Sequence, residues 1–224
     1  LRSVESKIEQ EYLALPQLCN KDLISIDIGM FRGVYSYLLS KYSKSVIGFE
    51  ANPIMYKYLE QNLKKIVKNI KIYNFALSNK ESEVCIKIPL RNKSNLRSNF
   101  EDFYEGGLAT IHQDNKLEGK KLETFKTKCN MLDNFKFNEK IGFIKIDVEG
   151  HEQLVLEGAV NTINKDMPNL LIEIEKKHRS DSIEKTFKYL SKLGYKAYTY
   201  KNNKLNLLTD FNNQNSVNYI FKAN

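Results

Sequence analysis

Cysteine is scarce in this sequence, and the few cysteines present form no pattern. Cys19, Cys85 and Cys129 lie far apart, are odd in number and never occur as a CxxC pair. Disulfide frameworks and cysteine zinc sites require paired or closely spaced cysteines, so neither is indicated. A reducing compartment is therefore expected, which points to a cytoplasmic location.

Long apolar runs are also lacking. No stretch approaches the roughly 18 apolar residues from which a membrane-spanning helix is built. The sequence starts with LRSVESKIEQEYLALPQL, which carries charges where a secretory signal needs an apolar core. We therefore expect neither a membrane span nor a signal peptide.

Both signs of charge are plentiful, but neither is concentrated. Lys and Arg number 35 against 27 Asp and Glu, which gives a net charge of +8 and raises the question of a polyanionic partner. The densest basic clusters, at 64–65, 120–121 and 176–179, are short and lie beside acids or at the ends of predicted elements. A solvated surface is favoured over a nucleic-acid interface, so no nucleic-acid partner is expected.

From residue 24 onward, short apolar runs alternate with longer stretches of helical spacing. Strands are predicted at 24–28, 45–50, 70–75, 141–147 and 169–175, and helices at 33–42, 53–67, 151–163 and 181–193. Several of these strands are apolar on both faces, as strands covered by helices on each side must be. The alternation predicts an α/β fold with a doubly wound, mostly parallel sheet.

Three parts of the chain depart from this alternation. Residues 1–22 are expected to form an N-terminal helical segment. The interval 78–140 is expected to be an insertion, with the strand-like segments EVCIKIP and KLETFKTKCNML on either side of a variable loop at 90–120. After Gly194, YKAYTY and SVNYIFKA predict an antiparallel hairpin at one edge of the sheet. We expect a single domain over residues 1–224.

The first predicted strand ends in an acidic glycine turn. Asp27 is followed by Gly29 and Gly33, where the first strand of a doubly wound sheet meets its first helix and ligands usually bind. A turn that binds a pyrophosphate has three glycines and no carboxylate inside it. This turn instead suits a cationic or hydroxyl-bearing ligand. The alternative is that Asp27 only ties down the loop.

Two more strand ends carry residues suited to a nucleoside. Glu50 closes the second strand, where a carboxylate can accept hydrogen bonds from two ribose hydroxyls. The third strand ends in NFALSN, which places Phe75, Ala76 and Leu77 where a flat ring could pack. A surface acid and ordinary core packing are the corresponding alternatives.

Acids crowd together in FIKIDVEGHE, residues 143–152, at the end of a strand whose apolar run places it in the middle of the sheet. Like charges such as Asp147, Glu149 and Glu152 raise one another's pKa and need a cation or hydrogen bonds nearby, which suggests a reaction site. Glu149 or His151 could act as a general base toward a hydroxyl. The carboxylates could hold a divalent metal, although nothing in their spacing indicates one. Alternatively, Glu149 and Glu152 favour the N-terminus of the following helix.

These segments, in this order, resemble the FkbM family of S-adenosylmethionine-dependent methyltransferases. The similarity runs through SIDIGMFRGVYSYLL, VIGFEANP, NFALSN, GFIKIDVEGHEQLVLEGA and PNLLIEIE, over roughly residues 20–177, and KIDVEGHE followed by LEGA is its distinctive part. The resemblance implies S-adenosyl-L-methionine as the cofactor. It also implies a Rossmann-like sheet of seven strands whose last strand is antiparallel.

The resemblance further implies where the cofactor binds. Asp27 and Gly29 would border the methionine moiety, Glu50 would hold the ribose, and Asp147 would lie near the reacting methyl. Ala76 and Leu77 would lie by the adenine. The predicted cofactor site also includes Met30, Gly33, Ala51 and Asn52. Where family members often have Ala-Asn after the first glycine, this chain has Met30-Phe31-Arg32.

The sequence thus predicts an O-methyltransferase that acts on a hydroxyl of a sugar or of a glycosylated natural product. The expected partner is a small-molecule or saccharide acceptor, and the helices carry no surplus apolar stripe for a protein partner. One alternative is a non-catalytic binding module on the same fold. Another is an NAD-dependent oxidoreductase, which is disfavoured because the first turn lacks a third glycine and contains Asp27.

Overall fold

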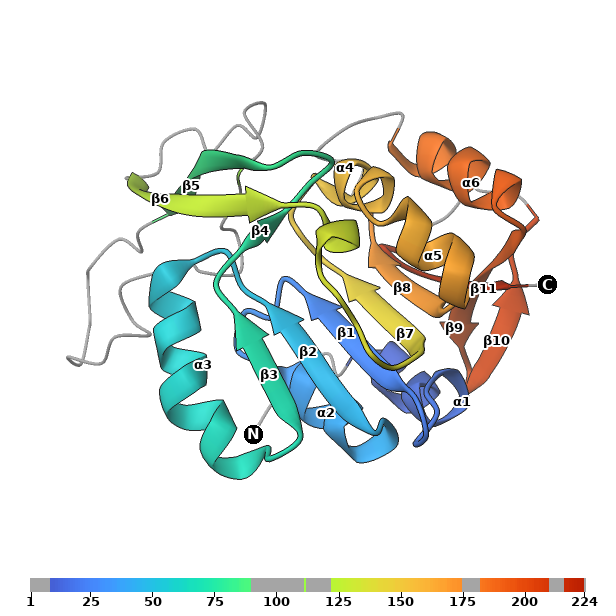
Figure 1. Cartoon of the computed structure of the whole chain (residues 1–224). Helices are drawn as coiled ribbons and strands as arrows, with labels where there is room; N and C mark the ends of the chain where they lie inside the picture. Colours follow the sequence, from blue (N-terminus) through green and yellow to red (C-terminus); the bar gives the residue numbers. More distant parts are fainter. Residues whose placement is uncertain (1–8, 90–110, 112–121, 175–181, 210–215, 224) are drawn as a thin grey trace, which may run out of the picture.

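The computed structural model of the protein describes residues 9–89, 111, 122–174, 182–209 and 216–223 (Figure 1). The main sheet contains β1 (Ile24–Ile28), β2 (Ser45–Phe49), β3 (Ile70–Tyr73), β7 (Ile141–Ile146), β8 (Asn169–Glu173), β9 (Tyr195–Lys201), β10 (Lys204–Leu207) and β11 (Asn218–Ala223). A smaller sheet contains β4 (Ala76–Leu77), β5 (Ser82–Pro89) and β6 (Leu122–Asn130). The helices are η1 (Gln10–Ala14), α1 (Leu15–Leu18), α2 (Val34–Tyr42), α3 (Pro53–Ile66), η4 (Leu132–Asn134), α4 (Glu152–Glu157), α5 (Val160–Asp166) and α6 (Ser182–Lys192).

The order of strands in the main sheet is β10-β9-β11-β8-β7-β1-β2-β3. Strands β3, β2, β1, β7 and β8 are parallel, whereas β11 runs antiparallel to β8 and β9. The chain winds from β1 through β2 to β3 on one side and later returns to β7 on the other side. The boundary between β1 and β7 is therefore the switch point at which a ligand crevice is expected.

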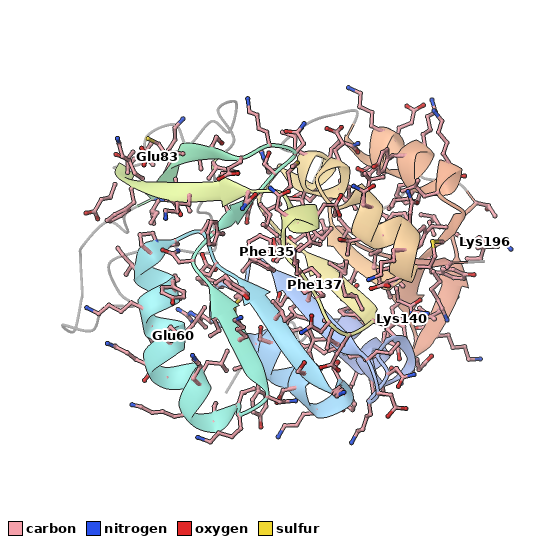
Figure 2. All side chains as sticks on the ribbon, in the orientation of Figure 1. Glu60, Glu83, Phe135, Phe137, Lys140 and Lys196 are labelled. Atoms are coloured by element: carbon pink, nitrogen blue, oxygen red, sulfur yellow. The ribbon has the colours of Figure 1, made fainter. Side chains whose placement is uncertain are left out.

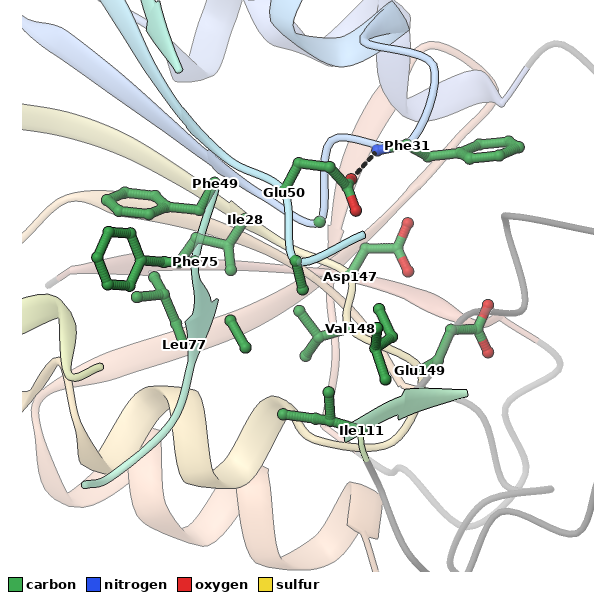
Figure 3. Close-up of a pocket in the computed structure, with 14 residues that line it drawn as sticks. Ile28, Phe31, Phe49, Glu50, Phe75, Leu77, Ile111, Asp147, Val148 and Glu149 are labelled. Carbon is green, nitrogen blue, oxygen red and sulfur yellow. Dashed lines mark hydrogen bonds between the residues drawn. The ribbon is translucent and has the colours of Figure 1, made fainter. Parts of the chain in front are cut away.

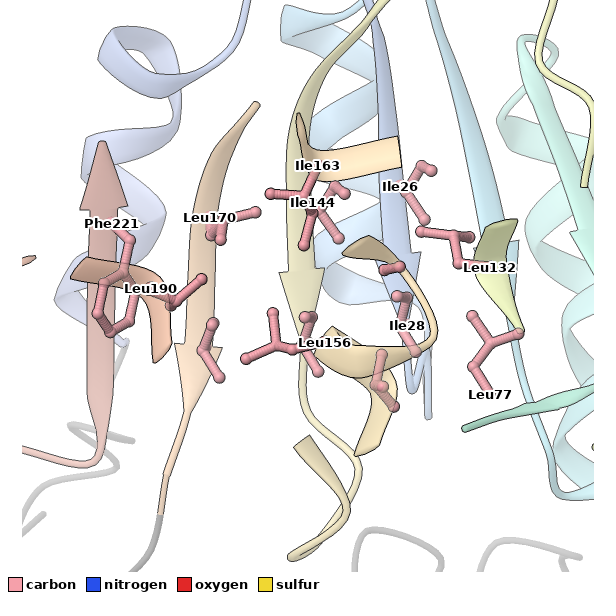
Figure 4. Close-up of a cluster of buried hydrophobic side chains, with 14 of the residues drawn as sticks. Ile26, Ile28, Leu77, Leu132, Ile144, Leu156, Ile163, Leu170, Leu190 and Phe221 are labelled. Atoms are coloured by element: carbon pink, nitrogen blue, oxygen red, sulfur yellow. The ribbon is translucent and has the colours of Figure 1, made fainter. Parts of the chain in front are cut away.

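Each face of the main sheet is covered by its own helices. All five side chains of β1 are buried, which is why its apolar run does not alternate. One face packs against α4, α5 and α6, as Figure 4 shows for Leu156, Ile163 and Leu190. The opposite face packs against α1, α2 and α3 through the residues Leu18, Leu39, Leu59 and Leu63.

The main sheet has eight strands, whereas seven were predicted. The two C-terminal strands that were predicted to pair, β9 and β11, are antiparallel neighbours, but the segment that connects them contains an additional strand, β10. Asn202 and Asn203 both have positive φ, which makes the tight two-residue turn that folds β10 back onto β9. The side chains of β10 are mostly exposed, so its sequence carries no apolar periodicity to reveal a strand.

The single helix predicted at 151–163 is also wrong, because the segment forms two helices. A Cβ at Gly158 would lie 1.9 Å from the carbonyl oxygen of Ser78, so the break between α4 and α5 packs directly against backbone. The Asp133 carboxylate accepts hydrogen bonds from the N–H groups of Asn161 and Thr162 and so starts α5 afresh. Ser78 and Asp133, which cause the break, are distant in sequence from the predicted helix, so its own residues do not reveal it.

The two strand-like segments predicted between residues 78 and 140 form β5 and β6. They pair with each other and, through β6, with β4, in a sheet that lies beyond the carboxyl ends of β1, β2 and β3 (Figure 1). After β6, Phe135 and Phe137 turn toward the main sheet, whereas charged side chains such as Lys140 and Lys196 point outward (Figure 2). The predicted variable loop at 90–120 lies outside the described residues except for Ile111.

The three cysteines are free thiols. In the part of the chain that the structure describes, no helix is both long and apolar enough to cross a membrane.

Candidate active site

A pocket opens at the carboxyl edge of the main sheet, at the switch point between β1 and β7 (Figure 3). The space between its lining residues, including the part that is open to solvent, is about 690 Å³. The lining comes from the ends of β1, β2, β3 and β7, from the smaller sheet and from Ile111: Ile28, Gly29, Phe31, Phe49, Glu50, Ala51, Phe75, Ala76, Leu77, Ile86, Ile111, Asp147, Val148 and Glu149.

The turn after β1 requires glycine at position 29. Gly29 has φ +81°, and a Cβ there would lie only 1.8 Å from the carbonyl oxygen of Asp147. The Gly29 N–H donates to the Phe49 carbonyl over 3.0 Å, while the Asp147 N–H donates to the Ile28 carbonyl over 3.0 Å. The ends of three strands therefore close around this glycine, and the backbone itself forms the floor of the pocket.

Glu50 lies buried at the end of β2 with both carboxylate oxygens held. Oε2 accepts from the Phe31 N–H and Oε1 from the Asn52 N–H, each over 2.8 Å. Burial raises the pKa of Glu50 to about 7, against the lowering effect of these two hydrogen bonds. A carboxylate oxygen has two lone pairs, so each can accept a further bond from a hydroxyl in the pocket.

The wall beside Glu50 is apolar. The ring of Phe135 packs edge-on against Phe49 and Phe75, with ring centroids 4.9 and 5.6 Å apart. Ala76 and Leu77 continue this wall, and Ile86 of β5 extends it from the smaller sheet. A flat, uncharged ring fits such a surface.

The loop after β7 carries the acids predicted from the sequence. Glu149 has φ +52° and is followed by Gly150 at +93°, a conformation that is strained for a glutamate. Glu152 stabilises the loop, because its Oε1 accepts from the N–H groups of Val148 and Gly150 over 3.3 and 2.9 Å. Burial raises the pKa of Glu152 to about 7. Figure 3 shows Asp147 and Glu149 directed to the same side of the pocket.

Seven of the residues predicted for the site line this pocket. They are Gly29, Glu50, Ala51, Ala76, Leu77, Asp147 and Glu149, and Phe75, which was expected to pack against a flat ring, lines it as well. Sequence reasoning did not select the lining residues Ile28, Phe31, Phe49, Ile86, Ile111 and Val148. Phe31 and Val148 are chain neighbours of predicted residues and could have been included, but only the position of the smaller sheet brings Ile86 to the pocket.

The other five predicted residues lie behind the lining. Asp27 is fully buried and accepts from the Ser36 hydroxyl over 2.6 Å, whereas buried Met30 fills the space beside Gly48. Gly33 starts α2 with φ +75°, where a Cβ would press on Leu59 and Leu63. Asn52 caps α3, its Oδ1 accepting from the Ile54 and Met55 N–H groups. His151 is buried with Nε2 2.8 Å from the hydroxyl of Ser78.

Asp147, which follows β7 and lines the pocket, forms an ion pair with the buried side chain of Lys145. Lys145 Nζ lies 3.0 Å from Asp147 Oδ2. Among the described residues, no group of three or more His, Cys, Asp or Glu side chains is arranged to hold a metal ion.

A mostly parallel sheet with its pocket at the switch point gives the chain an α/β fold of the kind found in solved methyltransferase structures. The chain belongs to the FkbM methyltransferase family, because residues 27–197 match the family described as Methyltransferase FkbM domain. No curated protein sequence matches the chain significantly.

Solved structures show the same fold at low sequence identity. An FkbM methyltransferase from Methylobacillus flagellatus KT is 15% identical with a TM-score of 0.58, and the match covers 90% of this chain but only 44% of that one. A Streptococcus mutans protein assigned as a methyltransferase, solved in complex with SAH, is 14% identical with a TM-score of 0.51 and 99% coverage of both chains. An rRNA methylase from Streptococcus thermophilus is 14% identical with a TM-score of 0.50, covering 100% of this chain and 99% of that one.

Proposed function

We propose that this protein is an S-adenosylmethionine-dependent O-methyltransferase whose acceptor is a hydroxyl of a sugar or of a glycosylated natural product. The observation that carries the proposal is the combination, in one pocket, of a buried carboxylate at the end of β2 with an apolar wall at Ala76 and Leu77. The first suits a ribose diol and the second an adenine ring. Membership of the FkbM family supports the same reading.

The residues present fit this cofactor. When bound, S-adenosylmethionine supplies a methyl group on a positively charged sulfur. The lining includes the carboxylates of Glu50, Asp147 and Glu149, which favour a ligand that carries an ammonium and a sulfonium. We assign the ribose to Glu50 with Ala51 beside it, the adenine to Ala76 and Leu77, and the methionine end to Gly29 and Asp147.

Four further residues support these contacts from behind. The N–H of Asn52 orients the Glu50 carboxylate while its side chain caps α3. Asp27, Met30 and Gly33, which flank Gly29 in the chain and are all buried, shape the turn that presents Gly29. Such support is what keeps binding groups in a productive geometry.

Glu149 is the proposed general base. It lines the pocket, and its loop is held by the hydrogen bonds of Glu152, so its carboxylate can take the proton of an acceptor hydroxyl as that oxygen gains the methyl group. His151, the other candidate, would have to exchange its contact with Ser78 for one with the acceptor. The carboxylates of the lining favour a neutral hydroxylated acceptor over a polyanion.

Calorimetric titration of the purified chain with S-adenosylhomocysteine (SAH), beside NAD and with or without Mg²⁺, tests the cofactor. We expect one equivalent of SAH to bind, Glu50→Ala to abolish binding, and Glu60→Ala on the outer face of α3 to leave it unchanged. Binding of NAD instead would favour an oxidoreductase, and binding of neither ligand would favour a non-catalytic module. Methyl transfer to a panel of saccharides then tests the acceptor.

A further inference from the structure

One lysine lies buried directly beneath the pocket. Lys145 is in β7, opposite Asp27 of β1 in the sheet register, and its side chain is 6% exposed. Its ammonium donates to Asp147 Oδ2 over 3.0 Å and to the Gly29 carbonyl over 3.2 Å, and it lies 3.8 Å from Asp27 Oδ1. A single cation therefore connects the ends of β1 and β7, where the methionine end of the cofactor is assigned.

The surroundings fix this ammonium in place. The ring of Tyr35 lies 4.7 Å from Nζ, and the Tyr35 hydroxyl donates to Glu9 Oε2 over 2.6 Å, so Tyr35 of α2 and Glu9, which precedes η1, close the site on the side away from the pocket. Burial lowers the pKa of Lys145, but the Asp147 and Asp27 carboxylates outweigh that effect and raise it overall. Lys145 therefore stays protonated, and its buried ammonium is held by protein groups rather than by water.

The distances show which carboxylate the lysine orients. A lysine that only neutralised the fully buried Asp27 would approach that residue most closely, yet Asp27 Oδ1 makes no hydrogen bond and its other oxygen is bound by Ser36. The short contacts go to Asp147 and Gly29, which both line the pocket. The side chain of Asp147 is 27% exposed, so its carboxylate can contact a ligand while Lys145 holds Oδ2.

We infer that Lys145 is a positioning residue of the methyl-donor site: it holds the Asp147 carboxylate and the Gly29 carbonyl in the orientation that receives the amino-acid end of the cofactor. This inference rests on the proposed function. The formal charges of Asp27, Lys145 and Asp147 sum to −1, which leaves a net attraction for a cationic ligand. Without the lysine, the Asp147 carboxylate can rotate, and preorganisation is lost.

A double-mutant cycle for SAH binding tests the inference by calorimetry. Because a hydrogen bond to a charged group is worth about 1.5–3 kcal/mol, we expect Lys145→Met and Asp147→Asn each to weaken SAH about 10- to 100-fold. The loss of SAH affinity in the double variant should be smaller than the product of the two single fold-losses, because Lys145 acts through Asp147. Lys64→Met, which removes an exposed lysine of α3, is the control for overall charge and should bind like the wild type.

A second pair of variants, both carrying Asp27→Asn, separates an effect on SAH binding from an effect on protein stability. Lys145→Met leaves Asp27 as a buried charge without its cation, which destabilises a protein strongly. We therefore also compare Asp27→Asn with Asp27→Asn/Lys145→Met, in which no such charge remains. A positioning role predicts weaker SAH binding in the double variant at a similar Tm. Equal affinity of these two variants would mean that Lys145 only neutralises Asp27.

A spectroscopic measurement uses the folded wild type. The ¹H–¹⁵N signal of the Lys145 ammonium, protected from exchange by burial, should shift as SAH is added and stop shifting at one equivalent. If the wild type binds SAH but this signal does not move, or if Lys145→Met binds like the wild type, the inference is wrong and the proposed function stands. If the wild type binds no SAH, the proposed function itself fails, and the inference with it.

Discussion

Replacing Glu50 by Gln removes the charge and one acceptor oxygen while it keeps the size of the side chain. In the structure both oxygens are in use, since Oε1 accepts from the Asn52 N–H and Oε2 from the Phe31 N–H. A protonated carboxyl can still accept through both oxygens, but an amide nitrogen cannot accept at all. Whichever way the Gln amide turns, its NH₂ therefore faces a backbone N–H.

The magnitude follows from that geometry. A buried donor without its acceptor costs about 1–3 kcal/mol. Since the Tm of a chain of this size falls by about 2–4 °C per kcal/mol, we expect Glu50→Gln to lower the Tm by about 2–12 °C. The affinity for SAH should fall by about 10- to 100-fold, because a ribose hydroxyl also loses a charged acceptor.

Thermal unfolding is measured at pH 5, where folded wild-type Glu50 is largely protonated and the variant differs mainly by the lost acceptor, because the raised pKa makes ionised Glu50 destabilising at higher pH. Calorimetry is measured at pH 8, where Glu50 is largely ionised. The matched control is Glu60→Gln on α3, where the side chain pairs with Lys64 at the surface and should change neither quantity. If Glu50→Gln kept both the Tm and the SAH affinity of the wild type, Glu50 would not anchor the turn or hold the ribose.

Three further changes have distinct expected outcomes. Gly29→Ala should lose SAH binding and destabilise the protein well beyond Gly194→Ala: both have positive φ, which costs about 1 kcal/mol, but only Gly29 would place a Cβ against backbone, and urea unfolding compares the two. Glu152→Gln keeps an Oε1 that can accept from Val148 and Gly150. Because burial raises the pKa of Glu152 from 4.5 to about 7, the folded state binds that proton more tightly than the unfolded chain, and the contribution of Glu152 to the unfolding free energy falls as pH rises from about 4.5 to 7. The variant should therefore match the wild type at pH 5 and be more stable at pH 8, and equal stabilities at pH 8 would refute this account. Glu149→Gln should reduce methyl transfer about 10²- to 10⁴-fold without changing SAH affinity, whereas full turnover would point to His151 as the base.

The parallel strands were accessible from sequence because each is an apolar, β-branched run between helical stretches. The prediction at 24–28 coincides with β1, and those at 45–50 and 141–147 differ from β2 and β7 by one residue at the end. The missed strand β10 and the break at Gly158 have a common cause. The side chains of β10 are mostly exposed, so its segment shows no apolar alternation. The break at Gly158 is due to close packing against the Ser78 carbonyl, which is distant in sequence, so the segment around Gly158 does not reveal it either.

The candidate site divides in the same way. Gly29, Glu50 and Asp147 could be predicted because each ends a strand, and the carboxyl ends of parallel strands meet at one edge of a sheet. Lys145 could not, since a lysine inside a predicted strand usually indicates a solvent-facing position. Its environment depends on Asp27, Tyr35 and Asp147, which converge only when β1, α2 and β7 are packed together.

By itself, the sequence determined the α/β class, the run of parallel strands and the strand ends that carry glycines and acids, because these follow from local periodicity and residue type. Only the tertiary structure decided which side chains face the pocket and which support it from below. Hydrogen bonds and ion pairs such as those of Glu50 and Lys145 act over a few ångströms, and their partners are up to 116 residues apart in the chain. Spatial proximity of that kind is a property of the packed fold.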